Sequence, residues 1–416
     1  MNLLKTSFFT SISTAVTFIS GFIVTKVVAV KIGPAGVAYV GQFQNSIAVL
    51  ALFSTFAITV GVVKYIAGNN NDRVKQQQVI TTALSIILLG SFGVSLIVIS
   101  GSVFFSKAIF HSSDFWAVYL MYGLFVGITA LNSLFSAVLN GFKEIRNLTI
   151  VNIVSSLTGI LFTVLFAYTL GVKGVLIASN FTALVVFCIN IYFVRRLNWI
   201  RWKPSFRKWD KKMVKLLFAF TVMGLTSGFA VPAMQFFVRN KIITDFSLVD
   251  AGCWQAITRI SDYYLAFITT VLSVYYLPRL SEIKNNADMR KEIMYGYKII
   301  LPAVGFLALL IWLCKVWVVH ILFTADFLPM LPLFKYQLLG DFFKIGSWLV
   351  SYIMVAKALT KNFLVTEIVF SLSFVLFSYV LINRYGVIGA TYAFCINYGI
   401  YWITMWLLMK KHFAKS

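Results

Sequence analysis

The segment VDAGCWQAITRISDYYLAFITTVLSVYYL (residues 249–277) decides how this chain folds, because it is apolar enough to cross a bilayer and yet carries charges. A spanning helix needs about 20 mostly apolar residues, since the hydrocarbon core is about 30 Å thick and each helical residue advances about 1.5 Å. Arg259 and Asp262 lie near the middle of this segment. A charge at the bilayer centre costs about 2.5–3.5 kcal/mol, so such groups face a protein interior or a wet cavity and often mark a transport pathway.

The remainder of the chain repeats this apolar pattern. Of its 416 residues, 60% are hydrophobic and only 12% are charged, which no ordinary soluble domain shows. We therefore expect an all-α integral membrane protein. Twelve transmembrane helices are predicted, at 7–30, 37–64, 79–102, 115–140, 149–170, 174–194, 213–238, 250–277, 297–319, 333–356, 363–382 and 388–409. The continuous runs exclude a transmembrane barrel, whose strands of about 10 residues alternate in polarity. The first run is too long for a secretion signal and lacks a cleavage pattern, so it is retained as a helix.

Basic residues gather in alternate connections between these helices. One side holds Lys5, Lys64, Arg73, Lys75, Lys143, Arg146, the segment 195–212, Arg279 to Lys298, Lys357, Lys361 and the tail from Lys410. The other side holds only Lys31, Lys107, Lys173, Arg239, Lys241 and Arg384. Because basic loops resist translocation, we expect both termini in the cytoplasm. This distribution accounts for the net charge of +23 without a nucleic-acid partner, and places the basic loops against anionic lipid.

An internal repeat divides the chain in two. Residues 146–166 match 361–381 at an offset of 215, and 170–179 match 385–394 at the same offset. Residues 34–45 match 250–261 at an offset of 216. A six-helix unit used twice, with both copies in one orientation, is the parallel type of transporter repeat. We expect an N-terminal lobe (1–194), a basic cytoplasmic loop that acts as a hinge (195–212) and a C-terminal lobe (213–416), with a cavity between the lobes.

Polar residues recur at helical spacing inside several apolar runs, and they provide the candidate site. The candidate substrate-binding residues are Lys26, Gln42, Asn45, Lys64, Arg239, Arg259 and Lys344. The candidate ion-coupling residues are Asp262, Asp341 and Glu367, the last about one turn inside its helix. Two alternatives remain open. Arg259 with Asp262, and Asp341 with Lys344, are three residues apart and could form structural ion pairs. Lys26 could instead extend its ammonium group to the outer membrane interface. Tyr263 and Tyr264, beside the charges, could stack on a sugar ring.

No enzyme or metal constellation stands out. The four cysteines and three histidines are scattered singly, which gives no disulfide framework and no metal site. The sequence also lacks a glycine-rich nucleotide loop and a nucleophile elbow. We therefore expect a transporter without cofactors, driven by an ion gradient or the membrane potential.

Several motifs resemble the Wzx family of polysaccharide-lipid flippases, and within it the branch that carries enterobacterial common antigen. They are TKVVAVKIGPAGV (25–37), GVVKYIA (61–67), VPAMQFFVRNK (231–241), SDYYLAFITTVLSVYYLPRLSE (261–282) and QLLGDFFKIGSWLVSYIMVAKA (337–358). The resemblance implies a V-shaped fold of two six-helix lobes from the multidrug, oligosaccharidyl-lipid and polysaccharide exporter superfamily. Its implied cargo is an undecaprenyl-pyrophosphate-linked oligosaccharide, moved to the outer leaflet. Its motifs include Lys26, Arg239, Asp262, Asp341, Lys344 and Glu367, whereas Arg259 lies outside the common-antigen pattern and leaves another glycan open.

Two other functions remain as alternatives. A multidrug exporter of the same fold would bind cations with acidic residues, whereas the predicted surplus of basic groups in the cavity favours an anionic cargo. A membrane-embedded glycan polymerase or ligase would need a large outer loop, and the predicted outer loops are short. The expected partners are the lipid-linked glycan, membrane lipids and a glycan polymerase with its chain-length regulator, and the protein is expected to function as a monomer.

Overall fold

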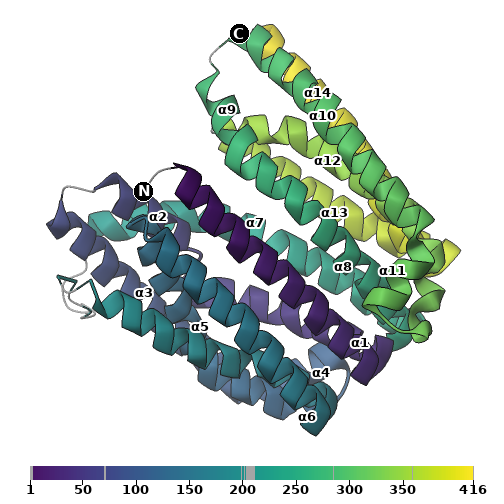
Figure 1. The fold of residues 1–416 in the computed structure, drawn as a ribbon, viewed down its shortest axis with the longest axis horizontal. Coiled ribbons are helices and arrows are strands. Elements are labelled where there is room, and N and C mark those ends of the chain that lie inside the picture. The colour runs from purple at the N-terminus through teal and green to yellow at the C-terminus, as the bar shows by residue number, and fades with distance from the viewer. Residues whose placement is uncertain are drawn as a thin grey trace. The chain divides into compact units, whose positions relative to one another are not determined.

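The computed structural model describes residues 3–69, 72–197, 199–200, 202, 211–283, 285–357 and 359–415, and every regular element in these ranges is helical (Figure 1). The α-helices of the N-terminal half are α1 (Leu3–Thr55), α2 (Thr59–Gly68), α3 (Arg73–Ser100), α4 (Ser102–Phe110), α5 (Trp116–Gly141) and α6 (Ile145–Arg195). Those of the C-terminal half are α7 (Lys211–Asp245), α8 (Leu248–Val271), α9 (Leu277–Glu282), α10 (Asn286–Leu313), α11 (Lys315–Leu322), α12 (Phe334–Ala356), α13 (Thr360–Tyr385) and α14 (Ile388–Lys415). Short turns are the 3₁₀ helices η1 (Ser113–Phe115) and η3 (Ala325–Leu333) and the π-helical η2 (Leu272–Tyr276).

The prediction of an all-α membrane fold is confirmed. Eight described helices are long and apolar enough to cross a membrane. Two of them, α1 and α6, each contain two helices joined at a non-helical glycine, Gly33 and Gly171 respectively. Counting both halves of these helices, and adding α7 and α8, gives twelve crossings within the described residues.

The chain forms two compact units. Unit 1 comprises residues 1–32 and 39–232, and unit 2 comprises residues 33–38 and 233–416. The short piece 33–38 belongs to unit 2 because it packs on the start of α8, where a Cβ added to Gly252 would lie 1.9 Å from the carbonyl oxygen of Pro34. The lobes 1–194 and 213–416, which follow the sequence repeat, remain a prediction.

The start of the predicted hinge loop packs into unit 1. Ile200 is buried in a core cluster of this unit, and Trp199 and Trp202 pack against the same cluster. The Trp202 ring lies edge-on to Phe135, with centroids 5.1 Å apart. Residues 203–210 of the predicted hinge lie outside the described residues.

The repeat seen in the sequence recurs in the helix boundaries. α5 ends at Gly141 and α12 at Ala356, positions separated by the same offset of 215. α6 and α13 begin at Ile145 and Thr360, again 215 apart. These matching boundaries support a common six-helix plan in the two halves.

The same glycine hairpin follows in both copies. Gly171 (φ 60°) and Gly386 (φ 70°) have positive φ values, which glycine adopts without the steric penalty of a side chain. Three residues later, a Cβ on Gly174 would lie 2.2 Å from the carbonyl oxygen of Phe166, and one on Gly389 would lie 2.1 Å from that of Leu381. Both hairpins therefore require glycine for the same reason.

The second crossing of unit 1 is broken, so the continuous helix predicted at 37–64 is wrong at this point. α1 ends at Thr55, where Phe56 and Ala57 have positive φ, before α2 begins. In unit 2 the crossing predicted at 250–277 stays helical from α8 through the π-helical η2 into α9, and η2 begins 216 residues after Phe56. No glycine or proline marks the break in the sequence of unit 1, because its room comes from α3: a Cβ on Gly90 would lie 2.6 Å from the carbonyl oxygen of Ser54.

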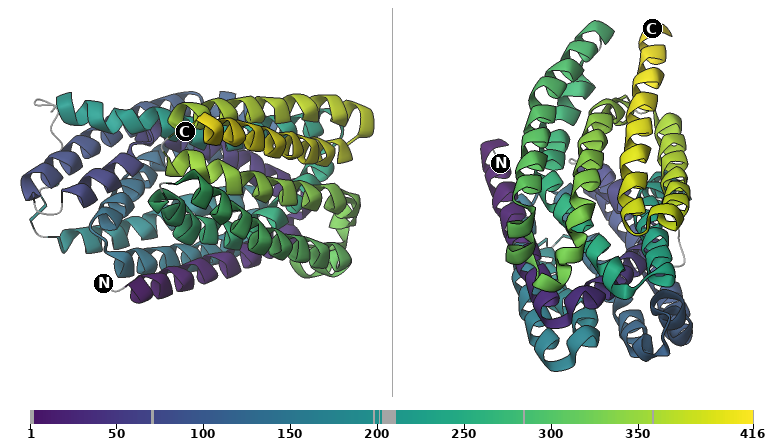
Figure 2. Two further views of the ribbon diagram at one scale, coloured as in Figure 1. Left: turned by 90° about the horizontal axis from the view of Figure 1, so that it is seen from above. Right: turned by 90° about the vertical axis from the view of Figure 1, so that its right-hand side faces the viewer.

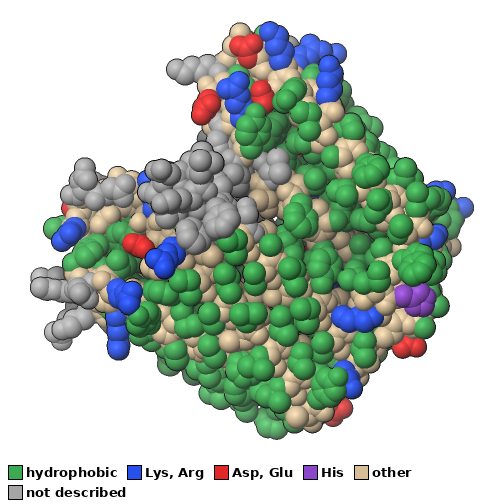
Figure 3. Space-filling view, in the orientation of Figure 1, with side chains coloured by type: hydrophobic (Ala, Val, Ile, Leu, Met, Phe, Trp, Pro, Cys, Tyr) green, Lys and Arg blue, Asp and Glu red, His purple; other side chains and the backbone are tan. Residues whose placement is uncertain are grey.

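Hydrophobic side chains cover the outer faces of the long helices. On α13 the exposed residues follow helical spacing on one face: Val365, Ile368, Val369, Leu372 and Leu376. In unit 2 the charged side chains gather at the end that α9 and the start of α10 form, and hydrophobic ones cover the helices below (Figure 3). The protein is thus a multi-pass membrane protein whose apolar flanks face lipid.

Candidate functional site

α8 and α12, which pack against each other in unit 2, are joined through a buried carboxylate. Figure 2 shows the helices of the C-terminal half, coloured teal-green to yellow, from two further sides. Asp341 on α12 is fully buried, and its Oδ2 accepts hydrogen bonds from Ser261 Oγ (2.6 Å) and Tyr264 Oη (2.9 Å) on α8. Gln337, one turn earlier on α12, donates from Nε2 to Ser261 Oγ (3.2 Å). Ser261 and Tyr264 share one face of α8 because they are three residues apart. The carboxylate is therefore held in a fixed position.

The second oxygen of Asp341 is available for a ligand or a proton. Oδ1 is buried and has no hydrogen-bond partner among the described residues. Burying a carboxylate oxygen without a partner is costly, and such groups commonly bind a proton, a cation or a water molecule. This oxygen is suited to the ion-coupling role predicted for Asp341.

Lys344 lies in an aromatic box on the same helix bundle. Its Nζ is 5.0 Å from the ring centroid of Trp348 on α12, and 5.9 Å and 5.7 Å from those of Phe394 and Tyr398 on α14. Ring faces attract an ammonium group within about 6 Å. This Lys344 aromatic box keeps the cation inside the protein.

Three carboxylates surround the same ammonium group. Lys344 interacts electrostatically with Asp262 on α8, Asp341 on α12 and Glu367 on α13. The three candidate ion-coupling residues, on three different helices, are thus within electrostatic range of one cation. We name Asp262, Asp341, Lys344 and Glu367 the unit 2 charge cluster.

A second basic group lies on α7. Arg239 is fully buried, donates to Gln255 Oε1 and lies with its guanidinium 5.6 Å from the centroid of the Trp254 ring. Arg259, partly buried on α8, repels it electrostatically. Two cations held close together in a low-dielectric interior favour binding of an anion between or beside them.

The predicted structural ion pairs are not formed. Five ion pairs lie within the described ranges, and none of them joins Arg259 to Asp262 or Asp341 to Lys344. Asp262 is exposed, so its carboxylate is accessible. Glu367 lies about two turns inside α13 rather than one, because that helix begins at Thr360.

The remaining candidate residues belong to unit 1. Lys26 is partly buried on the first half of α1, and Gln42 and Asn45 are buried on its second half. Lys64 is exposed on α2. Their role beside the unit 2 charge cluster remains a prediction.

The charge balance differs from the predicted surplus of basic groups. Within unit 2 the site brings together Arg239, Arg259 and Lys344 with Asp262, Asp341 and Glu367, which is three of each sign. The balance within this unit therefore does not discriminate between an anionic and a cationic cargo.

Sequence reasoning missed several residues of the site. Ser261 was not selected, and Tyr264 was considered only as a residue that could stack on a sugar ring, whereas its hydroxyl donates to Asp341. The aromatic box was also missed. The spacing of three residues between Ser261 and Tyr264, which puts them on one face of the helix, was the available signal. Phe394 and Tyr398 of the aromatic box give no such signal in a chain that is 17% aromatic.

The chain belongs to the polysaccharide biosynthesis protein family, which matches residues 3–284. The chain is similar to the Lipid III flippases of Escherichia coli (strain K12) and Shigella flexneri. Each is 30% identical to it over 407 residues, which cover 96% of both chains.

Solved structures share the fold at low sequence identity. An inward-facing multidrug resistance MATE family transporter of the MOP superfamily has a TM-score of 0.79 at 16% identity, covering 97% of this chain and 95% of that one. A MOP superfamily transporter from Pyrococcus furiosus, described as having a binding pocket of reverse polarity, has a TM-score of 0.74 at 15% identity, covering 99% and 95%. The fold is therefore that of MOP superfamily transporters.

Proposed function

We propose that this protein is a flippase that moves an undecaprenyl-pyrophosphate-linked oligosaccharide from the cytoplasmic to the outer leaflet. The observation that carries the proposal is the similarity over 96% of the chain to proteins named Lipid III flippase. Membership of the polysaccharide biosynthesis family agrees with a glycan as part of the cargo. The transporter fold supports a translocase rather than an enzyme.

The charges of unit 2 fit a cargo with a pyrophosphate. Moving such a group through hydrocarbon without partners would be prohibitive, so the protein must replace its hydration shell. Arg239, Arg259 and Lys344 provide hydrogen-bond donors that suit phosphate oxygens. The lipid tail remains in the bilayer, and only the polar head passes along the protein.

Ion coupling is assigned to the carboxylates of the same cluster. With the site open to the cytoplasm, Lys344 and the arginines bind the head group, together with Lys26 and Lys64 of unit 1. A proton or sodium ion that binds Asp262, Asp341 or Glu367 then resets the transporter by alternating access. The unpaired oxygen of Asp341 makes this residue the strongest candidate.

The location in the cell is a further part of this proposal. We place the protein in the bacterial inner membrane because its relatives are flippases of bacteria. We place both termini in the cytoplasm because basic connections resist translocation. The lobes 1–194 and 213–416 are proposed to be the two moving halves. A glycan polymerase and its chain-length regulator are the partners that would use the delivered lipid.

A transport assay in proteoliposomes tests the proposal. Purified protein is reconstituted with a fluorescent undecaprenyl-pyrophosphate saccharide, and the fraction accessible to an external glycosidase is measured over time. We expect accessibility to rise only with active protein, and to fall strongly for Lys344→Ala. Substrate that stays inaccessible with the folded wild-type protein would refute the flippase function.

A multidrug exporter is the second candidate, because three carboxylates in the cluster would also suit a cationic drug. Ethidium efflux measured in the same proteoliposomes separates the two functions. Ethidium transport without saccharide transport would favour the exporter.

A further inference from the structure

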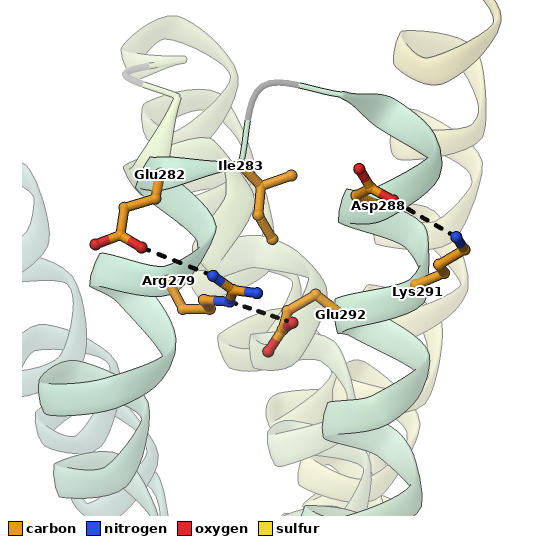
Figure 4. Close-up of a pocket in the computed structure, with 6 residues that line it drawn as sticks. All are labelled: Arg279, Glu282, Ile283, Asp288, Lys291 and Glu292. Carbon is orange, nitrogen blue, oxygen red and sulfur yellow. Dashed lines mark ion pairs between the residues drawn. The ribbon is translucent and has the colours of Figure 1, made fainter.

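A cavity lies at the end of unit 2 where α9 meets α10. It has a volume of about 450 Å³, within the usual range of ligand pockets. Five of its six lining residues are charged: Arg279, Glu282, Asp288, Lys291 and Glu292, with Ile283 as the sixth. Figure 4 shows the Arg279 side chain between Glu282 and Glu292, and Lys291 directed towards Asp288.

The ion pairs that line this cavity, which we name the corner cavity, are longer than hydrogen bonds. Arg279 lies 3.8 Å from Glu282 and 3.6 Å from Glu292, and Lys291 lies 3.6 Å from Asp288. These distances exceed those of a hydrogen bond, which are about 2.7–3.2 Å. Within the described ranges, no hydrogen bond forms to any of these five side chains, although Glu292 is only 14% exposed. Their donors and acceptors remain available to a ligand.

The equivalent positions of unit 1 form shorter contacts than those of the corner cavity. At the shared offset of 216, Asp72 and Lys75 correspond to Asp288 and Lys291, and they form a shorter ion pair of 3.1 Å. Gln76 corresponds to Glu292, is 3% exposed and donates from Nε2 to the carbonyl oxygen of Ile66 (3.1 Å). Unit 1 therefore has a shorter ion pair and a buried, hydrogen-bonded neutral side chain at this corner, whereas unit 2 has a third carboxylate at the position of Gln76.

The charges of the cavity select the class of ligand. Two cations face three carboxylates, so the cavity is net negative when all five are ionised. This balance disfavours an anion such as a pyrophosphate or an anionic lipid head. A group that carries both an ammonium and a phosphate could meet the carboxylates and the cations at the same time.

The surroundings of the cavity indicate a lipid rather than a soluble molecule. Met294 and Tyr295 lie one turn beyond Lys291 and Glu292 on α10, and they are 44% and 56% exposed. A tyrosine beside an apolar helix surface is typical of the membrane interface. Acyl chains can lie along this surface while the head group enters the cavity.

We propose that the corner cavity of unit 2 binds the zwitterionic head group of phosphatidylethanolamine. Its phosphate meets Arg279 and Lys291, and its ammonium meets Glu282 and Asp288. Glu292 holds Arg279 towards the phosphate. This site is separate from the unit 2 charge cluster and does not depend on what the protein transports.

Native mass spectrometry of the delipidated, full-length protein tests this inference. Dioleoyl-phosphatidylethanolamine and dioleoyl-phosphatidylglycerol are titrated in parallel. We expect the first to bind about tenfold more tightly, because the second offers no ammonium group. Glu282→Gln and Lys291→Gln, at side chains that are 71% and 81% exposed, should each reduce the preference to about twofold without affecting folding.

The duplicated corner provides the matched control. Asp72→Asn combined with Lys75→Gln removes the equivalent charges from unit 1 and should leave the preference unchanged. Equal binding of the two lipids, or an equal loss in the unit 1 variant, would overturn the site. Displacement of the lipid by free phosphoethanolamine at equal affinity would overturn the lipid assignment, whereas weak displacement supports it. Size-exclusion profiles verify that each variant is folded.

Discussion

The two halves of this chain share a backbone plan but differ in the chemistry at equivalent positions. In unit 2 the helices α8 and α12 are joined through Asp341 and carry the charge cluster around Lys344. At the repeat offset, Val126 and Thr129 on α5 correspond to Asp341 and Lys344. Val126 lies in an apolar core, and Thr129 donates to the carbonyl oxygen of Val126.

The contact between the equivalent helices of unit 1 is neutral. Ser46, which corresponds to Asp262, shares a hydrogen bond with Tyr119 (2.8 Å), and Tyr122 donates to the carbonyl oxygen of Ile47 (3.3 Å). Phe43 and Asn152 correspond to Arg259 and Glu367. The comparison shows that the shared fold does not require ionisable groups at these positions, so their presence in unit 2 indicates a function. The first prediction below concerns a feature that the two halves share, and the next three concern their differences.

Alanine at Gly174 or Gly389 should destabilise the protein severely, and by similar amounts. The added Cβ would overlap a backbone carbonyl oxygen in each hairpin, at 2.2 Å and 2.1 Å. We expect a loss of about 3 kcal/mol in each case, measured as a fall in apparent melting temperature and in the yield of monodisperse protein. Gly93→Ala, where no atom lies within 4 Å of the added Cβ, is the control. Tolerance at one hairpin alone would contradict the shared plan.

Giving Lys344 the residue of its unit 1 equivalent, as Lys344→Thr, should reduce flippase activity about 100-fold. The change removes the cation that interacts with three carboxylates and that is proposed to bind the pyrophosphate, and two lost charge-assisted contacts of about 1.4 kcal/mol each give this factor. Transport rates in proteoliposomes, normalised to folded protein, provide the measurement. Thr129→Ala in unit 1 should change the rate less than threefold. Full activity of Lys344→Thr would remove this residue from the substrate pathway.

Asp341→Asn should reduce transport about tenfold and abolish its dependence on the ion gradient. The amide retains an acceptor for Ser261 and Tyr264 but cannot bind a proton or hold a cation by charge. Transport is measured with and without an imposed proton or sodium gradient. Val126→Ala, at the equivalent position, is expected to keep the dependence. An Asp341→Asn variant that still responds to the gradient would assign coupling to another carboxylate.

Asp72→Ala should cause the smallest effect, a slight loss of stability at neutral pH only. The pKa of Asp72 lies below its ordinary value, chiefly because the backbone N–H of Lys75 donates to the carboxylate at the start of α3. A lowered pKa stabilises the fold at pH values above the unfolded pKa, and this contribution is lost as pH falls through the folded pKa. Thermal unfolding at pH 7 and pH 3 should therefore show a difference from wild type only at pH 7.

The equivalent residue in unit 2 gives the contrast. There α10 is capped by Asn285, whose Oδ1 accepts from the backbone N–H of Ala287, so Asp288→Ala should have no such effect. Equal losses in the two variants would contradict this difference in capping.

Much of the fold could be predicted from the sequence because hydropathy over about 20 residues dominates the free energy of a spanning helix. The repeat and the candidate charges were also accessible, since a buried ionisable residue is conspicuous in an apolar run. The break at Phe56 and Ala57 was not, because the space for it comes from Gly90 on another helix.

The site was predicted only in part. Asp262, Asp341, Lys344 and Glu367 were selected as single charges, and the structure brings them together from three helices. Phe394 and Tyr398 could not be selected, because their role comes only from the packing of α14 against α12. Single-sequence patterns identify groups that are costly to bury, but not the neighbours that make their burial possible.

The glycine hairpins at 171 and 386 also carry a record of descent. A positive φ at equivalent sites, followed by the same close approach three residues later, is unlike a coincidence of apolar composition, because the positive φ favours glycine and the close approach leaves no room for a Cβ. An ancestral gene encoding six crossings would already have contained this hairpin before it doubled. The charges that distinguish the halves would then have arisen after the duplication, gained by one copy or lost by the other, whereas the hairpins were already present.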